Sequence, residues 1–436
     1  MDKKTISAIV LTVVITGGAV GVIYWVATMK PEADTLEVYH WWTSGGEEDA
    51  ITALLGVFTA LYPNTTIIAT PVTGGAGYTF LTAIKTMALS GELPDSFQMH
   101  AGYEGQPYID ANLLKPIDDL WTSKNLTGVI PAVVQDMCKF GTKFYSVPVN
   151  IHRTNVVWYS RNVTTAAGVD VNNLTTWAGF FDACDKVKAA IPSITKPIAM
   201  GEAWTAAHVF EQIMASEGIG FYQDWVNGKV TSATNTTLLD ALIIFQKYLT
   251  YVNTDNTNMH WDTATGKIIT NASAFNIMGD WANGEFLKAY GANGFEVEYN
   301  VTMVPGTNDM YGLCIDCFET PVDAKHPTNS RRWLEVVSSQ AGQDAFNPLK
   351  GSISARTDAN MSKYGLYQQA ASANFKAVTH MYPSVVHGSG APEAFKVGLQ
   401  NIMSAFVGGT KTLTETAEAI VALTTSQTWT KVWNFA

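Results

Sequence analysis

Two segments of the sequence place an indole beside a carboxylate where an apolar stretch ends. In the segment 36–48, an alternating strand-like stretch stops at Trp42, and Glu47 follows in a polar turn that contains glycine. A second apolar stretch ends in Gly-Asp-Trp, with Asp280 next to Trp281. Open α/β sheets bind ligands at the ends of their strands. An indole face and a hydroxyl acceptor together suit a ligand with one apolar face and several hydroxyls, as sugars have.

A strand-like stretch at 93–100 also ends in polar side chains. Gln98 and His100 are two residues apart, so they share one face of this stretch. That face is either the buried side of the strand or a ligand-facing side. A neutral histidine can both donate and accept a hydrogen bond, which suits the recognition of hydroxyl groups.

Two of these residues also have an ordinary structural interpretation. Trp42 could fill a core, as large aromatic side chains at strand ends usually do. Glu47 stands three residues after Ser44, so the two could form a capping box at the start of the following helix. One carboxylate cannot serve both a helix cap and a bound hydroxyl, and we favour the hydroxyl.

Composition narrows the class of ligand. A chain of 436 residues is too long for one core and should divide into two lobes. Charged residues make up 15% of the chain and the net charge is −11, so no basic surface is available for the phosphates of a nucleic acid. We therefore expect no nucleic-acid partner. Few charges and many Thr, Asn and Trp residues suit a protein that recognises neutral polar molecules outside the cell.

The cysteines do not define a metal site. Cys314 and Cys317 have the spacing of half a zinc ribbon, but a second such pair and a nearby histidine pair are missing from the sequence. With Cys138 and Cys184 they form either extracellular disulfides, for which three complete pairings exist, or buried thiols. The glycine-rich segment 74–77 lacks the Gly-Lys-Ser/Thr ending of a phosphate loop. We expect neither a metal nor a cofactor.

The N-terminus carries a long apolar segment. The uncharged run Ile6–Met29, as a helix rising about 1.5 Å per residue, can span a bilayer core of roughly 30 Å. Lys3 and Lys4 before it favour a cytoplasmic N-terminus and place the rest of the chain outside. The run exceeds an ordinary signal-peptide core, so we expect a retained transmembrane anchor followed by a short tether. Lysines directly before the run also resemble an archaeal pilin-type signal.

Asn-x-Ser/Thr sequons are compatible with glycosylation of a chain outside the cell. They begin at Asn64, Asn125, Asn162, Asn173, Asn235, Asn271, Asn300 and Asn360. A Thr-rich chain generates such sequons by chance, so each one alone is weak. Together with the anchor they favour a glycosylated protein at the cell surface.

The order of strand and helix patterns indicates the fold class. Strands and helices alternate over the first hundred residues of the soluble part, which predicts a parallel doubly wound lobe. Extended segments at 144–153, 311–318 and 347–356 predict passages between two lobes. Apolar periodicity predicts helices in the second lobe at 177–190, 208–217, 238–251 and 283–290.

Separated motifs occur in order between Leu36 and the C-terminus. They are Trp41-Trp-x₄-Glu47, Pro94-Asp-Ser-Phe-Gln-Met-His-Ala-Gly102, Val147-Pro-Val-Asn-Ile-His-Arg153, Met278-Gly-Asp-Trp281 and Phe346-Asn-Pro-Leu-Lys-Gly-Ser352. Together they resemble the extracellular sugar-binding proteins of ABC importers, and most closely the glucose/galactose-binding branch of the maltose-binding-like group. The N-terminal anchor resembles archaeal members only.

The resemblance implies an α/β fold of the periplasmic-binding-protein type, with two α/β lobes joined by three crossing segments. We expect residues 1–35 to form the signal, the transmembrane anchor and the tether. Lobe one would contain residues 36–150 and 314–350. Lobe two would contain residues 151–313 and 351–436.

The resemblance also implies a function without catalysis. One monosaccharide, glucose or else galactose or mannose, would be held between the lobes and passed to ABC permease subunits served by a cytoplasmic ATPase. The chain would be monomeric, extracellular and anchored to the cytoplasmic membrane. The expected sugar-binding residues are Trp42, Glu47, Gln98, His100, His152, Trp204, Asp280, Trp281, Lys350 and His387, with Trp261 as a weaker candidate.

Several of these residues also have a structural interpretation that involves no sugar. His152 could be a histidine packed in a hinge, Lys350 a solvated hinge lysine and His387 a loop residue. Glu47 and Asp280 could also be the acid and nucleophile of a surface glycosidase, since carboxylates that bind sugars and those that cleave them look alike in sequence. An oligosaccharide could replace the monosaccharide. A surface adhesin would leave the strand-end indoles without an explanation.

Overall fold

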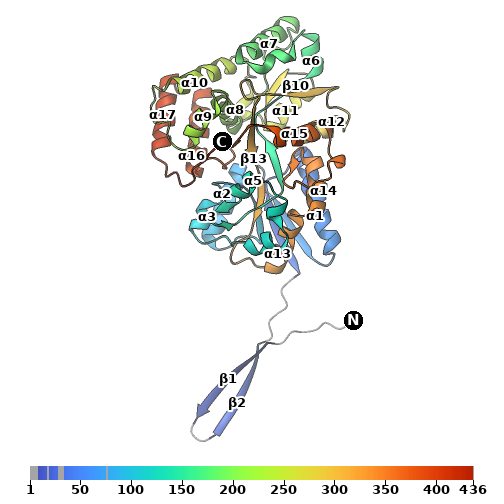
Figure 1. Cartoon of the computed structure of the whole chain (residues 1–436), viewed down its shortest axis with the longest axis vertical. Coiled ribbons are helices and arrows are strands. Elements are labelled where there is room, and N and C mark those ends of the chain that lie inside the picture. Colours follow the sequence, from blue (N-terminus) through green and yellow to red (C-terminus); the bar gives the residue numbers. More distant parts are fainter. Residues whose placement is uncertain (1–7, 17–18, 28–33, 75–76, 436) are drawn as a thin grey trace.

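The computed structural model describes residues 8–16, 19–27, 34–74 and 77–435. Most of them belong to an α/β body in which helices surround three sheets (Figure 1). The five-stranded sheet has the order β4-β3-β5-β14-β8. Its strands are β3 (Thr35–His40), β4 (Thr66–Pro71), β5 (Ser96–His100), β8 (Val147–Pro148) and β14 (Asp316–Glu319).

The first strands of this sheet form the parallel unit that the sequence predicts. β4 and β5 both run parallel to β3, and helices α1 (Gly45–Leu61) and α2 (Tyr78–Ser90) make the connections. Leu36 and Val38 are fully buried and alternate with less buried residues along β3, as in a strand with one face on a core. β14 joins the sheet antiparallel to β5.

A three-stranded antiparallel sheet lies toward the other end of the body (Figure 1). β10 (Val156–Ser160) is its central strand, between β11 (Phe275–Ile277) and β12 (Tyr299–Met303). Every residue of β10 and β11 is buried. This explains their continuous apolar character, because helices cover both faces of the sheet.

A four-stranded sheet with the order β15-β9-β13-β16 contains the predicted passages. Its strands are β9 (Asn150–Arg153), β13 (Met310–Cys314), β15 (Ile353–Ser354) and β16 (His380–Pro383). Only one residue separates β8 from β9, and only one separates β13 from β14. Two chain segments therefore pass directly from the five-stranded sheet to the four-stranded one. The residue boundaries of the two lobes remain a prediction.

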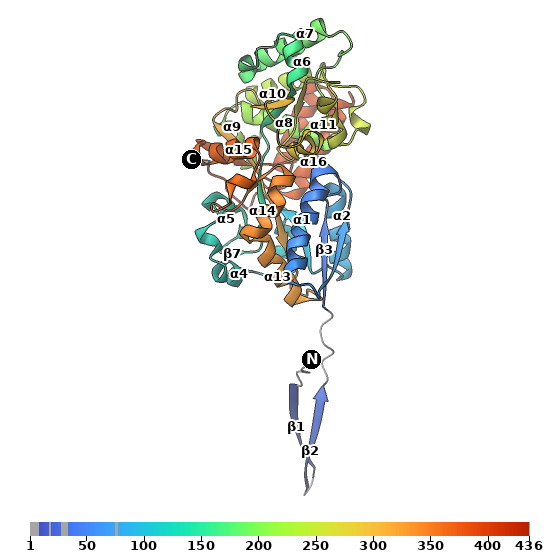
Figure 2. The same ribbon diagram turned by 90° about the vertical axis from the view of Figure 1, so that its right-hand side faces the viewer.

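Helices occupy the rest of the body, with α13 and α7 at its opposite ends in both views (Figures 1 and 2). After α1 and α2, the helices within the first 200 residues are α3 (Gln106–Asp110), α4 (Asp118–Ser123), α5 (Ala132–Met137), α6 (Arg161–Ala166) and α7 (Trp177–Ala190). They are followed by α8 (Ala203–Ser216), α9 (Ile219–Val226), α10 (Thr236–Leu249), α11 (Trp261–Ile269) and α12 (Ala282–Tyr290). The last are α13 (Pro327–Val337), α14 (Gln340–Lys350), α15 (Leu366–Ala377), α16 (Glu393–Val407) and α17 (Leu413–Thr425). Short elements complete the set: β6 (Lys139–Phe140), β7 (Lys143–Phe144), and 3₁₀ turns at Leu126–Gly128, Val171–Thr175, Asn256–Asn258 and Met361–Lys363.

The N-terminal segment differs from the expected single helix over Ile6–Met29. β1 (Ala8–Thr16) and β2 (Ala19–Ala27) pair as antiparallel strands. β-branched residues are frequent in both stretches and two glycines separate them in the sequence, a pattern that favours strands and a turn. Within the described part of the chain, no helix is long and apolar enough to cross a membrane. The anchor and its processing site therefore remain predictions, and parts of that segment lie outside the described residues.

The four cysteines are buried thiols. Cys138, Cys184, Cys314 and Cys317 are all free. Burial raises the pKa of each thiol above its usual value, since a thiolate is poorly solvated in an apolar interior. Of the two alternatives left by the sequence, the structure has thiols and not disulfides.

Glu319 in β14 is a buried carboxyl group that makes the free energy of unfolding depend on pH. The Ser146 hydroxyl donates to its Oε1 at 2.6 Å, and Oε2 has no partner among the described residues. Burial raises the pKa of Glu319 to about 8, although the Ser146 hydrogen bond lowers it. The folded protein thus keeps a proton that the unfolded chain releases near pH 4.5. The stability that this proton contributes is complete below that pH and is lost progressively as the pH rises to about 8.

We therefore expect Glu319→Gln to raise the thermal unfolding temperature by a few degrees at pH 8 and to change it little at pH 4.5, because glutamine resembles the neutral acid. Differential scanning calorimetry at both pH values measures this. Glu418→Gln, at an exposed position, is the matched control. An equal effect of Glu319→Gln at both pH values would contradict the assignment.

Candidate functional site

A small cavity lies among residues of the five-stranded and four-stranded sheets and of helices α1, α8, α11 and α14. The lining residues that come from the first 110 residues, β14 and α14 are Trp41, Thr43, Glu47, Gly74, His100, Asp316 and Lys350. The other lining residues are His152, Trp204, His260, Trp261, Trp281, Cys314 and His387. The cavity therefore brings together strand ends and helix ends that are far apart in the sequence.

Seven of the ten predicted site residues line this cavity. They are Glu47, His100, His152, Trp204, Trp281, Lys350 and His387. The weaker candidate Trp261 lines it too. Trp42, Gln98 and Asp280 do not belong to the lining; they lie behind it.

Trp42 is the clearest correction, because it is a core residue. It is 1% exposed and its ring packs against Phe346 and Phe318, with ring centroids 4.7 and 5.8 Å away. Trp41 lines the cavity instead, 4.7 Å from the ring of His100. Consecutive residues of an extended chain point to opposite sides, so only one of the two indoles can face the cavity.

Asp280 does not line the cavity but contacts His152, which does. Its carboxylate accepts a hydrogen bond from His152 Nδ1 and another from the Tyr367 hydroxyl at 3.2 Å. The other ring nitrogen of His152, Nε2, lies 3.3 Å from Asp316 Oδ2. Burial and the charge of Lys350 lower the pKa of His152, but the two carboxylates raise it more, so the net shift is upward. The two carboxylates therefore favour the protonated form of His152 in the wall of the cavity.

Asp316 is the central acceptor of the site and was missing from the sequence-based set. Its carboxylate accepts hydrogen bonds from Asn150 Nδ2 at 2.7 Å and Gln98 Nε2 at 3.1 Å. Burial raises the pKa of Asp316, but His152 and Lys350 lower it to well below the usual value. The carboxylate is therefore ionised. Gln98 also accepts from the backbone N–H of Trp41 at 3.0 Å, so it positions two lining residues.

Lys350 and Glu47 form a buried ion pair at the edge of the cavity. Lys350 Nζ lies 2.7 Å from Glu47 Oε1. Burial lowers the pKa of Lys350, but Glu47 and Asp316 raise it above its usual value. Ser44 is the N-cap residue of α1 and makes no side-chain capping bond. Glu47 is thus not engaged in the capping box that the sequence allowed.

His100 is held from behind by a buried carboxylate. Its Nδ1 lies 3.1 Å from Glu104 Oε2, and Glu104 Oε1 accepts from Lys396 Nζ at 2.7 Å. Burial raises the pKa of Glu104, but Lys396 and His100 lower it to about 2. This arrangement fixes the imidazole ring in the cavity wall.

Aromatic rings form the other wall. The ring of Trp281 lies 4.8 Å from that of His387 and 6.2 Å from that of Trp204. His260 Nδ1 lies 2.8 Å from Asp262 Oδ1, and this hydrogen bond raises the pKa of His260. His260 is not among the residues predicted from the sequence, because no strand-end pattern marks it.

Helices α1 and α12 meet at the mouth of the site. The Gly46 N–H donates to Glu285 Oε1 at 3.2 Å, and Lys288 Nζ lies 3.0 Å from Asp49 Oδ2. A Cβ atom on Gly46 would lie 2.7 Å from the Gly284 Cα, so glycine is required for this approach. α1 follows the first strand of the five-stranded sheet and α12 follows β11 of the three-stranded one. The two parts of the body are therefore in direct contact across the site.

Comparison with known proteins identifies the class. Residues 42–344 match the family of bacterial extracellular solute-binding proteins, and the chain belongs to this family. An uncharacterized ABC transporter extracellular-binding protein of Pyrococcus horikoshii is 38% identical over 381 residues, covering 86% of this chain and 84% of that protein. The predicted membership of the extracellular binding proteins of ABC importers is thereby confirmed. Members of this family are binding proteins, so the glycosidase alternative is set aside.

Two further comparisons add detail. A probable sugar-binding periplasmic protein of Rhizobium meliloti is 28% identical over 415 residues, covering 93% of this chain and 97% of that protein. A solved structure of a chitin oligosaccharide binding protein is 16% identical, with a TM-score of 0.78 over 90% of this chain and 98% of the other. The second likeness confirms the predicted periplasmic-binding-protein-like α/β fold.

The geometry predicts which carboxylate keeps His152 protonated. We expect Asp280→Asn to lower the pKa of His152, because the mutation removes a contacting negative charge. An NMR pH titration of selectively labelled histidine measures this. Asp262→Asn is the control, since it changes the carboxylate beside His260 and leaves the contacts of His152 intact. An unchanged His152 titration in Asp280→Asn would contradict the proposed contact.

Proposed function

We propose that the chain binds one neutral hexose in this cavity, glucose or else galactose or mannose, and delivers it to an ABC importer. The observation that carries the proposal is a single cavity that combines indole rings with ionised groups of both signs. Trp41 and Trp281 supply apolar ring faces, and Asp316, Lys350 and His152 supply polar contacts. A sugar ring has an apolar face and a rim of hydroxyls, and such a lining complements both.

The charges of the lining favour an uncharged ligand. Asp316 and Glu47 are acceptors, whereas Lys350 and the protonated His152 are donors that lie beside them. Each charge already has an opposite charge in contact, so a charged ligand would leave one charge unbalanced. A neutral hydroxyl can donate to a carboxylate and accept from an ammonium group at the same time.

The same lining provides selectivity between sugars. A buried hydroxyl without a partner costs about 1–3 kcal/mol. A sugar that lacks a hydroxyl, or holds it in another orientation, leaves a site group such as Asp316 unpaired. Discrimination between sugars therefore follows from fixed polar groups, and Gln98, Glu104 and Asp280 fix them from behind.

A monosaccharide is favoured over an oligosaccharide by the contact between α1 and α12. Gly46 and Glu285 meet at the mouth of the site, and the ion pair of Lys288 with Asp49 lies beside them. An oligosaccharide would have to extend past this contact. The relative named for chitin oligosaccharides shares the fold, and an oligosaccharide ligand is the alternative that a titration series would detect.

Binding would be coupled to a relative movement of the part of the body that contains α1 and the part that contains α12. We take the described form as closed, and an open form would separate α1 from α12 and admit the sugar. A sugar that contacts both parts would bind the closed form more tightly than the open form, and this difference in affinity would favour closure. The closed form would then dock on two permease subunits served by a cytoplasmic ATPase.

The proposal includes an extracellular location with an N-terminal membrane anchor. The family is one of extracellular proteins, and the apolar run before residue 30 would hold this member at the membrane. Several sequon asparagines are exposed and would be accessible to glycosylation: Asn64, Asn125, Asn162, Asn173 and Asn360. Asn235 is used differently, because its side chain caps α10 by accepting from the Leu238 N–H at 3.0 Å.

Asp316→Asn tests the proposed acceptor. We expect glucose affinity to fall tenfold or more, because the amide cannot accept from every donor now served by the carboxylate. Isothermal titration calorimetry with glucose, galactose, mannose, maltose and xylobiose measures this and separates mono- from disaccharides. Asp344→Asn, which changes a buried carboxylate outside the cavity, is the matched control. Unchanged sugar affinity in a folded Asp316→Asn variant would remove Asp316 from the site.

The adjacent residues Trp41 and Trp42 should differ in function, one contributing to sugar binding and the other to stability. We expect Trp41→Ala to weaken sugar binding tenfold or more, because it removes the ring that faces the cavity. Trp42→Ala should instead lower unfolding stability by about 3–5 kcal/mol, as loss of a core aromatic does. Titration calorimetry and chemical denaturation of both variants measure the two effects. Loss of affinity in a stable Trp42→Ala variant, with Trp41→Ala unaffected, would reverse the assignment.

A further inference from the structure

His208 is a fully buried histidine that has no role in the cavity lining. It lies on α8 at 0% exposure, and neither ring nitrogen has a hydrogen-bond partner among the described residues. Burial lowers its pKa to about 3, although the backbone of Thr154 raises it. The imidazole is therefore neutral. A buried polar ring without partners is costly, so His208 is suited to bind a ligand.

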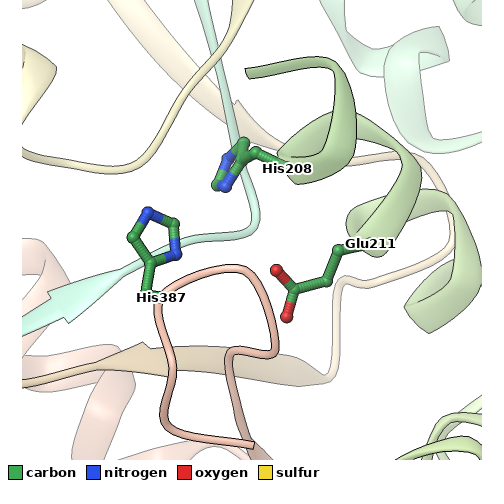
Figure 3. A group of neighbouring side chains, drawn as sticks. All are labelled: His208, Glu211 and His387. Carbon is green, nitrogen blue, oxygen red and sulfur yellow. The ribbon is translucent and has the colours of Figure 1, made fainter. Parts of the chain in front are cut away.

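Glu211 lies on the same helix, three residues further on, and its side chain faces the same region (Figure 3). Its carboxylate accepts from the Tyr222 hydroxyl at 2.6 Å and the Val385 N–H at 2.6 Å. The Ser384 hydroxyl and the Val386 N–H donate to its other oxygen at 2.9 and 3.3 Å. Within the described part of the chain, no salt bridge to Glu211 is found. These four donors occupy the lone pairs of both oxygens, so a cation bound here would replace one of them, and the Val386 N–H at 3.3 Å is the most distant.

His387 completes the group from the loop after β16 (Figure 3). Its Nδ1 lies 2.8 Å from Ser384 Oγ, which also contacts Glu211. Its Nε2 has no partner in the described structure. Nδ1–H can donate to Ser384, whose hydroxyl then donates to Glu211, and this chain leaves a lone pair on Nε2. Metal-binding histidines are commonly oriented by such an outer hydrogen bond.

We propose that His208, Glu211 and His387 form a site for a zinc-type divalent cation. One ligand atom from each residue can be chosen so that all three lie within 4.8 Å of one another. Two imidazoles and one carboxylate are a donor set that Zn²⁺ uses, with a fourth position left for water. Tetrahedral Zn²⁺ needs its ligands roughly 3.4 Å apart, given bonds of about 2.1 Å. Rotation of the His208 ring can supply this approach, since no side chain among the described residues is hydrogen-bonded to either ring nitrogen.

A bound water is the competing occupant. Water would satisfy the imidazole nitrogens, because an internal water needs only two to four polar partners. It would not supply the positive charge that the buried Glu211 carboxylate lacks. The cation does both, and it also joins α8 to the loop that carries His387. His387 then serves the sugar cavity as a wall beside Trp281, and the metal site stands whether or not the cavity binds a hexose.

Metal content tests the proposal. The full chain is prepared without chelators, incubated with Zn²⁺, freed of excess metal by gel filtration and assayed by elemental analysis. We expect about one zinc per chain for the parent protein and less than about one fifth of that for His208→Phe and Glu211→Gln. Phenylalanine fills a similar space, and His208 has no hydrogen bonds to lose, so this variant should fold. His380→Phe, the same change at a partly exposed histidine outside the group, should keep the metal.

A second measurement keeps the test decisive if the variants do not fold. Co²⁺ replaces Zn²⁺ in the parent protein, and a saturable visible absorption typical of a four-coordinate site with nitrogen ligands supports the proposal. A folded parent that keeps no zinc and gives no Co²⁺ spectrum would overturn it, and water would then be the occupant. Full zinc retention by folded His208→Phe would also overturn it and place the metal elsewhere, for example at His260.

Discussion

The buried, ionised carboxylate of Asp316 is the group on which the site depends. It lies at the start of β14, one residue after β13, where the chain passes from the four-stranded sheet to the five-stranded one. A buried charge is tolerated only when other charges and donors surround it. Here His152, Asn150 and Gln98 contact it directly, and the charge of Lys350 lowers its pKa further. Residues from several chain segments are thus held in place by one acceptor.

This network holds the polar side chains of the cavity wall in position before a ligand binds. Asp280 orients His152 and Glu104 orients His100, each from the side away from the cavity. Fixed polar groups lose little conformational freedom when they bind, so more of the interaction energy is available for affinity. They also impose a defined pattern of donors and acceptors on the ligand. A neutral polyhydroxyl ring can match such a pattern without disturbing its balance of charge.

Much of the fold could be predicted from the sequence, because local patterns decide it. The alternating pattern of β3 and the apolar periodicity of α7 (Trp177–Ala190) gave the correct element types, and α7 has the predicted bounds. Two direct passages between the sheets lie within the predicted segments 144–153 and 311–318, whereas the third predicted segment, 347–356, begins in the last turn of α14. The N-terminal run was assigned to a helix from its length and hydropathy, and β1 and β2 show that β-branched composition and a central Gly-Gly pair carried the opposite signal.

The site could be predicted only in part, because it depends on side-chain direction and on contacts between distant segments. Strand ends point to the region of the cavity, but period-two alternation has to be followed past the end of β3 to see that Trp41 and not Trp42 lines it. Asp316 stands between two cysteines in Cys-Ile-Asp-Cys, a local pattern that indicates thiol chemistry and gives no sign of the contacts that the acid makes with distant residues. The capping box at Glu47 was a valid local pattern, and only the position of Lys350, which is distant in sequence, decides against it.

The central claim is that Asp316 and its neighbours bind a neutral hexose between the indole walls. A crystal structure of the chain grown with glucose tests this most directly. The account predicts one sugar ring between Trp41 and Trp281, with at least one hydroxyl within hydrogen-bond distance of Asp316 and another near Lys350. Glucose bound outside this cavity, or within it without contact to Asp316, would contradict the account.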